Sequence, residues 1–159
     1  MAVAPPAMAA LSRPAAALHP TPATKPERVL TITDFHDGPR CGIALFNGAA
    51  HSYHAVFDVD LDDYSDIFML SPINDALLAL ALEDWAIWLR WRAAFQQHLT
   101  PLASHPALDP DRLRHQQLKQ LIGQRLMATD DTAPRRRAGF SQCGACDDWS
   151  LASVVWQAV

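Results

Sequence analysis

The pair Asn47-Gly48 constrains the fold most strongly, because it lies between two stretches of β-type sequence. Asn and Gly readily adopt the positive backbone angles that a type I′ turn requires. Residues 41–46 precede this pair, and residues 51–57 follow it with alternating apolar and polar side chains. The pattern predicts a β-hairpin, so the fold must contain an antiparallel pair of strands here.

Two further stretches of β-type sequence flank this hairpin. Residues 29–35 are rich in β-branched side chains and are followed by the turn sequence Asp-Gly-Pro. Residues 67–70 are apolar and end at a Ser-Pro pair, which favours a turn. Together with the hairpin, these stretches predict a meander of four antiparallel strands.

After the meander, the spacing of apolar residues becomes that of helices. Asn74 can cap a helix whose apolar side chains recur every three or four residues as far as about His98. The apolar arc of this helix is wide, so we expect it to be largely buried across the sheet. A second helix is predicted at residues 109–127, where a proline at the first helical position favours it. Two final strands are predicted at residues 136–142 and 151–158.

The order of these elements predicts one α+β domain over residues 27–159. Its antiparallel sheet has four to six strands, from an N-terminal meander and a C-terminal hairpin, and packs against two helices. Residues 1–26 contain nine Ala and six Pro but no aromatic residue, which favours a disordered tail. Prolines interrupt the apolar stretch that a secretory signal needs, and no apolar run reaches the roughly 18 residues of a membrane span. We therefore expect a cytoplasmic protein without membrane contacts.

Four segments of the predicted domain resemble segments of other proteins. They are D-F-H-D-G-P-R-C-G-I-A at residues 34–44, F-M-L-S-P-I at residues 68–73, the Trp-rich L-E-D-W-A-I-W-L-R-W within the long helix, and V-V-W near Trp156. Together they resemble a group of small uncharacterised bacterial proteins, over about residues 29–159. The resemblance implies a bacterial single-domain α+β protein, and it supplies no activity, cofactor or site residue.

Charge and motif content argue against several functional classes. The chain has 13 Lys and Arg against 17 Asp and Glu, and its basic residues are scattered, so it lacks the electropositive footprint of a nucleic-acid-binding domain. Three cysteines are too few for a disulfide framework. A Gly-rich phosphate loop, a G-x-S-x-G elbow and an H-E-x-x-H motif are all absent from the sequence. We therefore expect no cofactor and favour a non-enzymatic protein.

Carboxylates are concentrated between the third and fourth predicted strands, at Asp58, Asp60, Asp62, Asp63 and Asp66. A calcium loop of the EF-hand type would need Gly at its sixth position and Glu at its twelfth, where the segment has Asp63 and Met69. Clustered like charges instead favour recognition of a basic protein surface. An interaction or regulatory protein, for example one that neutralises a toxin, is therefore the leading hypothesis. The basic residues 135–137 could blunt a sheet edge, or pair with the acidic segment of a second copy in a homodimer.

Three tryptophans recur every three residues in the long helix, at Trp85, Trp88 and Trp91. This spacing drifts by about 60° around a helix, so the three side chains cannot share one narrow stripe. We expect two of them in the core. Trp91, which Arg90 and Arg92 flank, is expected at an exposed edge, where an aromatic side chain can anchor a partner protein.

A catalytic site is the alternative hypothesis. Asp34 and His36 lie at the end of the first predicted strand, and His51 and His54 lie on the returning arm of the hairpin. Imidazole titrates near neutral pH and binds transition metals, so these groups could form the centre of a small hydrolase or metal-dependent enzyme. Because His51 and His54 are three residues apart in a strand, they face opposite sides, and only one of them can join the other two residues.

Cys143 and Cys146 have the C-x2-C spacing of metal-binding and redox pairs. A structural zinc site needs four ligands, and Cys41 is the only other cysteine in the chain. The pair is therefore half a site, which Cys41 with a histidine, or a second copy, would have to complete. We expect a tight turn between the last two strands instead.

Overall fold

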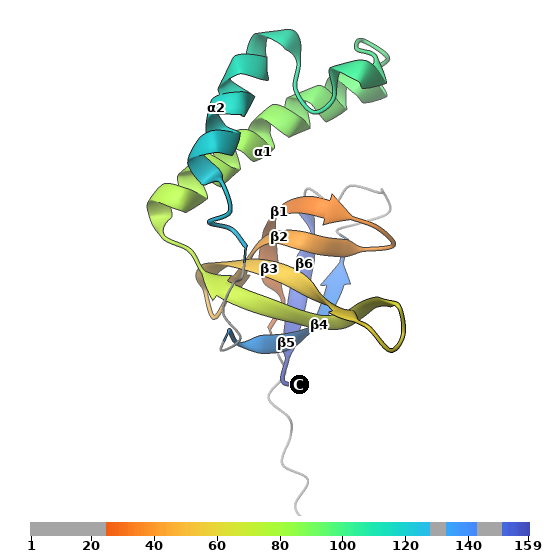
Figure 1. Cartoon of the computed structure of the whole chain (residues 1–159), viewed down its shortest axis with the longest axis vertical. Helices are drawn as coiled ribbons and strands as arrows, with labels where there is room; N and C mark the ends of the chain where they lie inside the picture. The colour runs from red at the N-terminus through yellow and green to blue at the C-terminus, as the bar shows by residue number, and fades with distance from the viewer. Residues whose placement is uncertain (1–24, 128–132, 143–150) are drawn as a thin grey trace, which may run out of the picture.

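The computed structural model describes residues 25–127, 133–142 and 151–159 (Figure 1). Six antiparallel strands form a closed barrel in the order of the sequence, because the last strand pairs with the first. The strands are β1 (Glu27–Phe35), β2 (Pro39–Phe46), β3 (Ala49–Asp58), β4 (Asp63–Pro72), β5 (Arg135–Ser141) and β6 (Ser153–Gln157). The predicted α+β class, with an antiparallel meander, a C-terminal hairpin and two helices, is confirmed.

Helices α1 (Asp75–Gln96) and α2 (Arg112–Ile122) form an antiparallel hairpin outside the barrel (Figure 1). Short 3-10 turns at Leu102–Ser104 and Asp109–Asp111 lie between them. The side chain of Asn74 accepts a hydrogen bond of 2.8 Å from the backbone N–H of Leu77, as the capping prediction requires. An apolar cluster joins the two helices and contains Leu77, Ile87, Ala107, Leu118 and Ile122. Within the described part of the chain, no helix is long and apolar enough to cross a membrane.

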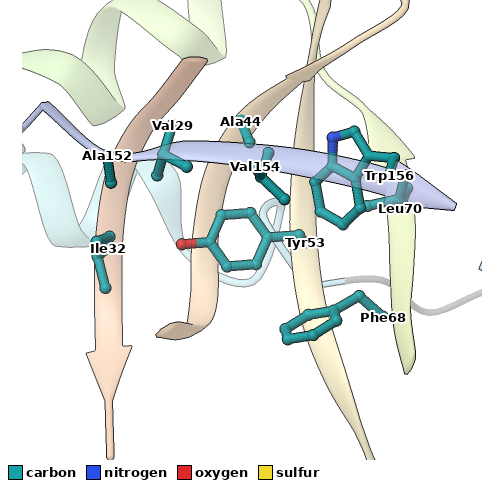
Figure 2. Packing of buried hydrophobic residues seen from close by; sticks show 9 residues of the cluster. All are labelled: Val29, Ile32, Ala44, Tyr53, Phe68, Leu70, Ala152, Val154 and Trp156. Carbon is teal, nitrogen blue, oxygen red and sulfur yellow. The ribbon is translucent and has the colours of Figure 1, made fainter. Parts of the chain in front are cut away.

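Tyr53 lies at the centre of the barrel and is fully buried (Figure 2). The centroid of its ring lies 5.9 Å from that of Phe68, 5.4 Å from that of Phe140 and 6.3 Å from that of Trp156. Its hydroxyl donates a hydrogen bond of 3.1 Å to the backbone carbonyl of Thr31. Because side chains pack the inside of this small barrel, a ligand would have to bind outside it.

The turn between β2 and β3 is the one that the sequence predicted. Asn47 and Gly48 have φ angles of 52° and 77°, which are the positive values of a type I′ turn. The carboxylate of Glu27 accepts hydrogen bonds from both of their backbone N–H groups, at 2.8 and 2.9 Å. This contact attaches the turn to the beginning of β1.

The expectation that the long helix is largely buried across the sheet is wrong. The buried residues of α1 are Leu77, Ala81, Ile87 and Trp91, and the rest of the helix is partly buried or exposed. The physical reason is the closure of the barrel, which already covers the inner face of the sheet and leaves its outer side to the helices. The helical hairpin therefore lies beside the barrel, with α1 next to β1 (Figure 1). Apart from its last two residues, the predicted tail at residues 1–26 lies outside the described part of the chain.

Candidate functional site

A cavity of about 560 Å³ lies between β1 and the helical hairpin. This volume is typical of pockets that bind small organic molecules. One wall is formed by β1, through Thr31, Ile32, Thr33 and Phe35. The opposite wall is formed by the helices, the loop between them and the turn after α2, through Ala81, Asp84, Trp85, Trp88, Arg92, His105, Pro106, His115, Lys119, Ile122 and Leu126.

The helical wall follows from the spacing of residues along α1. Positions 81, 85, 88 and 92 are separated by three or four residues, so their side chains form one stripe along the helix. The apolar residues Leu80 and Ile87, which pack in the cluster with α2, lie on a neighbouring stripe. The helix therefore packs against α2 with one stripe and presents the other to the cavity.

Two stacked indoles form the aromatic part of this wall. The rings of Trp85 and Trp88 have centroids 4.6 Å apart and an angle of 17° between their planes. Trp85 also packs against the apolar core of the barrel. The guanidinium of Arg92 lies 5.5 Å from the centroid of the Trp88 ring, within the distance of a cation–π contact. Contacts on several sides thus hold the two indoles in place.

A polar cluster of three side chains joins the two helices at the cavity. Nδ1 of His115 lies 2.6 Å from one carboxylate oxygen of Asp84, and Nζ of Lys119 lies 3.2 Å from the other. The side chains of Asp84 and His115 are only 14% and 15% exposed. Because Nδ1 faces a carboxylate, it carries the proton in this contact, and Nε2 is the ring atom that can bind a ligand. None of these three residues is among the site residues predicted from the sequence.

Trp91 is 5% exposed, so the expectation that it is an exposed anchor is wrong. Its indole N–H donates a hydrogen bond of 2.9 Å to the hydroxyl of Ser104, and its ring stacks on that of Phe95. The loop that follows α1 supplies Ser104 and thereby covers this side chain. The tryptophans that reach the cavity are instead Trp85 and Trp88, both partly buried.

The predicted acidic segment spans the turn between β3 and β4 and the first residues of β4. One carboxylate oxygen of Asp58 accepts hydrogen bonds from the backbone N–H groups of Asp60 and Leu61, at 2.9 and 3.2 Å. This arrangement is that of an Asx turn, in which a side chain replaces a backbone acceptor. Asp58 therefore stabilises the turn.

Two carboxylates of the acidic segment pair with arginines of the same chain. Asp63 lies 3.8 Å from Arg40, and Asp66 lies 2.7 Å from Arg137. The second pair forms because β4 and β5 are neighbours, with Ile67 opposite Arg137 in the ladder. Arg137 was a candidate for pairing with the acidic segment of a second copy, and here it pairs within its own chain.

The candidate catalytic residues are only partly brought together. The strand register places Asp34 opposite Cys41, and Cys41 opposite His54, so these three positions form a row across β1, β2 and β3. His36 lies just beyond β1 next to Asp37, and His51 lies three residues from His54 along β3. Burial lowers the pKa of His54, and its buried Nδ1 has no hydrogen-bond partner among the described residues.

Within the described residues, no group of three or more His, Cys, Asp or Glu side chains could hold a metal ion. Cys143 and Cys146 lie outside the described residues. Burial raises the pKa of the Cys41 thiol to about 11, and the nearby Asp34 carboxylate adds to this effect. Cys41 is therefore a thiol, not a thiolate, near neutral pH.

This raised pKa predicts slow alkylation of Cys41. Only the thiolate reacts, so a rise of two pKa units lowers the reactive fraction about 100-fold at any pH well below both values. In a Cys143→Ser/Cys146→Ser variant, iodoacetamide should modify the folded protein about 100-fold more slowly than the urea-unfolded protein. Mass spectrometry at about pH 8 measures both rates. Equal rates in the two states would contradict the prediction.

Comparisons with protein-family models, curated proteins and solved structures found no match to this chain. A relationship to the small uncharacterised bacterial proteins stays a prediction. The pocket and its side chains are therefore the basis on which a function can be assigned.

Proposed function

We propose that this protein is a binding or regulatory module that takes a small organic ligand with an aromatic body between the barrel and the helical hairpin. The observation that carries the proposal is the pair of stacked indoles, Trp85 and Trp88, in the wall of a cavity of about 560 Å³. Large aromatic side chains gain most from complete burial, and these two keep part of their surface toward the cavity. A flat apolar molecule would cover that surface.

The opposite wall supports the same class of ligand. Ile32 and Phe35 of β1 line the cavity across from the helices, and Phe35 is exposed. A ligand in this position would contact the barrel and both helices at once. It would therefore stabilise the folded protein and fix the helical hairpin against β1, which is a basis for regulation.

Filling the cavity from the barrel side should prevent binding. Thr33 is an exposed residue of β1 that lines the cavity, and tryptophan is well tolerated in strands. The neutral fluorophore N-phenylnaphthylamine, which brightens in apolar sites, should bind the wild type at one saturable site. Thr33→Trp should lower its affinity at least about tenfold, because the new indole occupies the space of the ligand.

The matched control is Ser141→Trp, which adds the same side chain at an exposed position of β5 away from the cavity. This variant should bind the fluorophore as the wild type does. The proposal fails if the wild type shows no saturable binding, or if Thr33→Trp and Ser141→Trp bind equally well.

The turn between β3 and β4 supports a second proposal, the recognition of a basic protein surface. Val59 and Leu61 at its tip are 83% and 73% exposed. The neighbouring carboxylates of Asp60 and Asp62 form no ion pair with any described residue. An acidic tip with apolar side chains is complementary to a basic, amphipathic segment of a partner. A toxin-neutralising protein would use such a surface.

Neutralising the unpaired carboxylates should weaken this recognition. The variant Asp60→Asn/Asp62→Asn should bind a helical peptide of Leu and Lys about tenfold more weakly than the wild type at low salt. The control Asp66→Asn/Asp109→Asn loses the same charge from residues that pair with Arg137 and Arg112. Fluorescence anisotropy measures both affinities. Equal weakening in the two variants would mean that net charge alone causes the loss of affinity. It would contradict recognition by a specific surface at the β3–β4 turn.

A further inference from the structure

The charges that line the pocket indicate the chemistry of its ligand. Lys119 and Arg92 are the basic side chains with positive charge in the lining, and Asp84 is the one carboxylate among the described lining residues. Both oxygens of that carboxylate are already engaged, one by His115 at 2.6 Å and the other by Lys119 at 3.2 Å. Among the described lining residues, the two cations therefore outnumber the one carboxylate, whose oxygens both have partners.

This arrangement disfavours a cationic ligand. An aromatic cage for an ammonium group needs open ring faces, and a nearby carboxylate strengthens it. Here the guanidinium of Arg92 already lies 5.5 Å from the centroid of the Trp88 ring. A second cation would meet the charges of Arg92 and Lys119, and the one carboxylate among the described lining residues is already paired.

Donors for an anion are present on the same wall. The ammonium group of Lys119 has three N–H donors, and its ion pair with Asp84 involves a single carboxylate oxygen. Its side chain is 57% exposed, so a ligand can reach the ammonium group while the contact with Asp84 is kept. Asp84 holds both His115 and Lys119 at the cavity, which reduces the entropy lost when a ligand orders them.

We propose that the ligand of this pocket is an aromatic carboxylate, with its ring against Trp85 and Trp88 and its carboxylate bound by Lys119. This inference rests on the proposed function, because it requires that the pocket binds a ligand. The carboxylate forms a charge-assisted hydrogen bond with the Lys119 ammonium. The positive charge of Arg92 adds attraction at longer range.

Three probes that share one ring test the charge preference. They are naphthylacetate, naphthylacetamide and naphthylethylamine, which carry a negative, neutral and positive group. By titration calorimetry with the wild type, the carboxylate should bind at least about tenfold more tightly than the amide, as expected for a hydrogen bond between charged groups. The amine should bind most weakly.

Two variants locate the source of the preference. Lys119→Met should bind the carboxylate and the amide with similar affinity, because the ammonium group that distinguishes them is gone. Arg125→Met removes the same charge from a residue that does not line the cavity, and it should retain the tenfold preference. A preference that survives in Lys119→Met would overturn the role of this residue.

The outcomes separate the inference from the proposed function. If the carboxylate and the amide bind the wild type equally, the pocket binds aromatic molecules, but the inference that its ligand is an anion is wrong. Tightest binding of the amine would overturn the inference in favour of a cation site. If none of the three probes binds, the proposed function itself is wrong, and the inference falls with it.

Discussion

Replacing Gly42 with alanine is expected to destabilise the barrel by about 3 kcal/mol, the upper part of the usual range for overpacked cores. A Cβ atom at this position would lie 2.6 Å from the hydroxyl of Tyr53 and against the backbone carbonyl oxygen of Thr31. Neither group can move away easily, because the Tyr53 hydroxyl donates a hydrogen bond of 3.1 Å to that same carbonyl. Glycine is required here because β1 and β2 approach each other over a buried ring.

Urea denaturation followed by circular dichroism measures this effect. Gly139→Ala is the matched control, since the nearest atom to its new Cβ would be the Val155 carbonyl oxygen at 4.0 Å. That variant should change the free energy of unfolding by less than about 0.5 kcal/mol. In a Tyr53→Phe background, Gly42→Ala should cost less, because the hydroxyl oxygen, one of the three atoms nearest to the new Cβ, is gone. Equal stabilities of Gly42→Ala and Gly139→Ala would contradict this account of the barrel.

Truncating Trp88 should cause the largest loss of ligand binding. Removal of a central aromatic side chain from a binding site commonly costs about 2 kcal/mol or more, which corresponds to about 30-fold in affinity. We therefore expect Trp88→Ala to bind N-phenylnaphthylamine at least about 30-fold more weakly than the wild type. The substitution also removes the ring that stacks on Trp85, since the centroids of the two indoles lie 4.6 Å apart.

Two further variants separate binding from folding. Trp88→Phe keeps an aromatic ring in the wall and should recover most of the affinity. Leu82→Ala truncates an exposed residue of the same helix that does not line the cavity, and it should bind as the wild type does. Wild-type affinity in Trp88→Ala would show that the stacked indoles do not contact the ligand.

Local signals in the sequence were sufficient to predict the strands and helices, but not to predict that the barrel closes. The turn at Asn47-Gly48 and the helix cap at Asn74 depend on residues a few positions apart, so the chemistry of a short segment predicts them. Closure depends on the pairing of Glu27 and Arg28 with Val154 and Ser153, at the opposite end of the domain. No short segment carries information about that pairing.

The candidate site was harder to predict for the same reason. Trp91 has the same spacing as the other two tryptophans, and it is buried only because the loop that carries Ser104 returns over it. Asp84 and His115 are 31 residues apart, and each reads as an ordinary polar residue of a helix. Their contact depends on the register of the two helices, which periodicity does not specify. Proximity along the chain instead suggested His36, which lies in an exposed turn.

The central claim is that an aromatic anion binds between β1 and the helical hairpin. Amide and indole NMR spectra recorded during a titration with naphthylacetate test it most directly, because they locate the ligand on the chain. We expect saturable shifts of the indole N–H signals of Trp85 and Trp88 and of the amides of Thr31 and Thr33, with the β3–β4 turn unaffected. Shifts confined to the β3–β4 turn, or no saturable shifts at any residue, would contradict the claim.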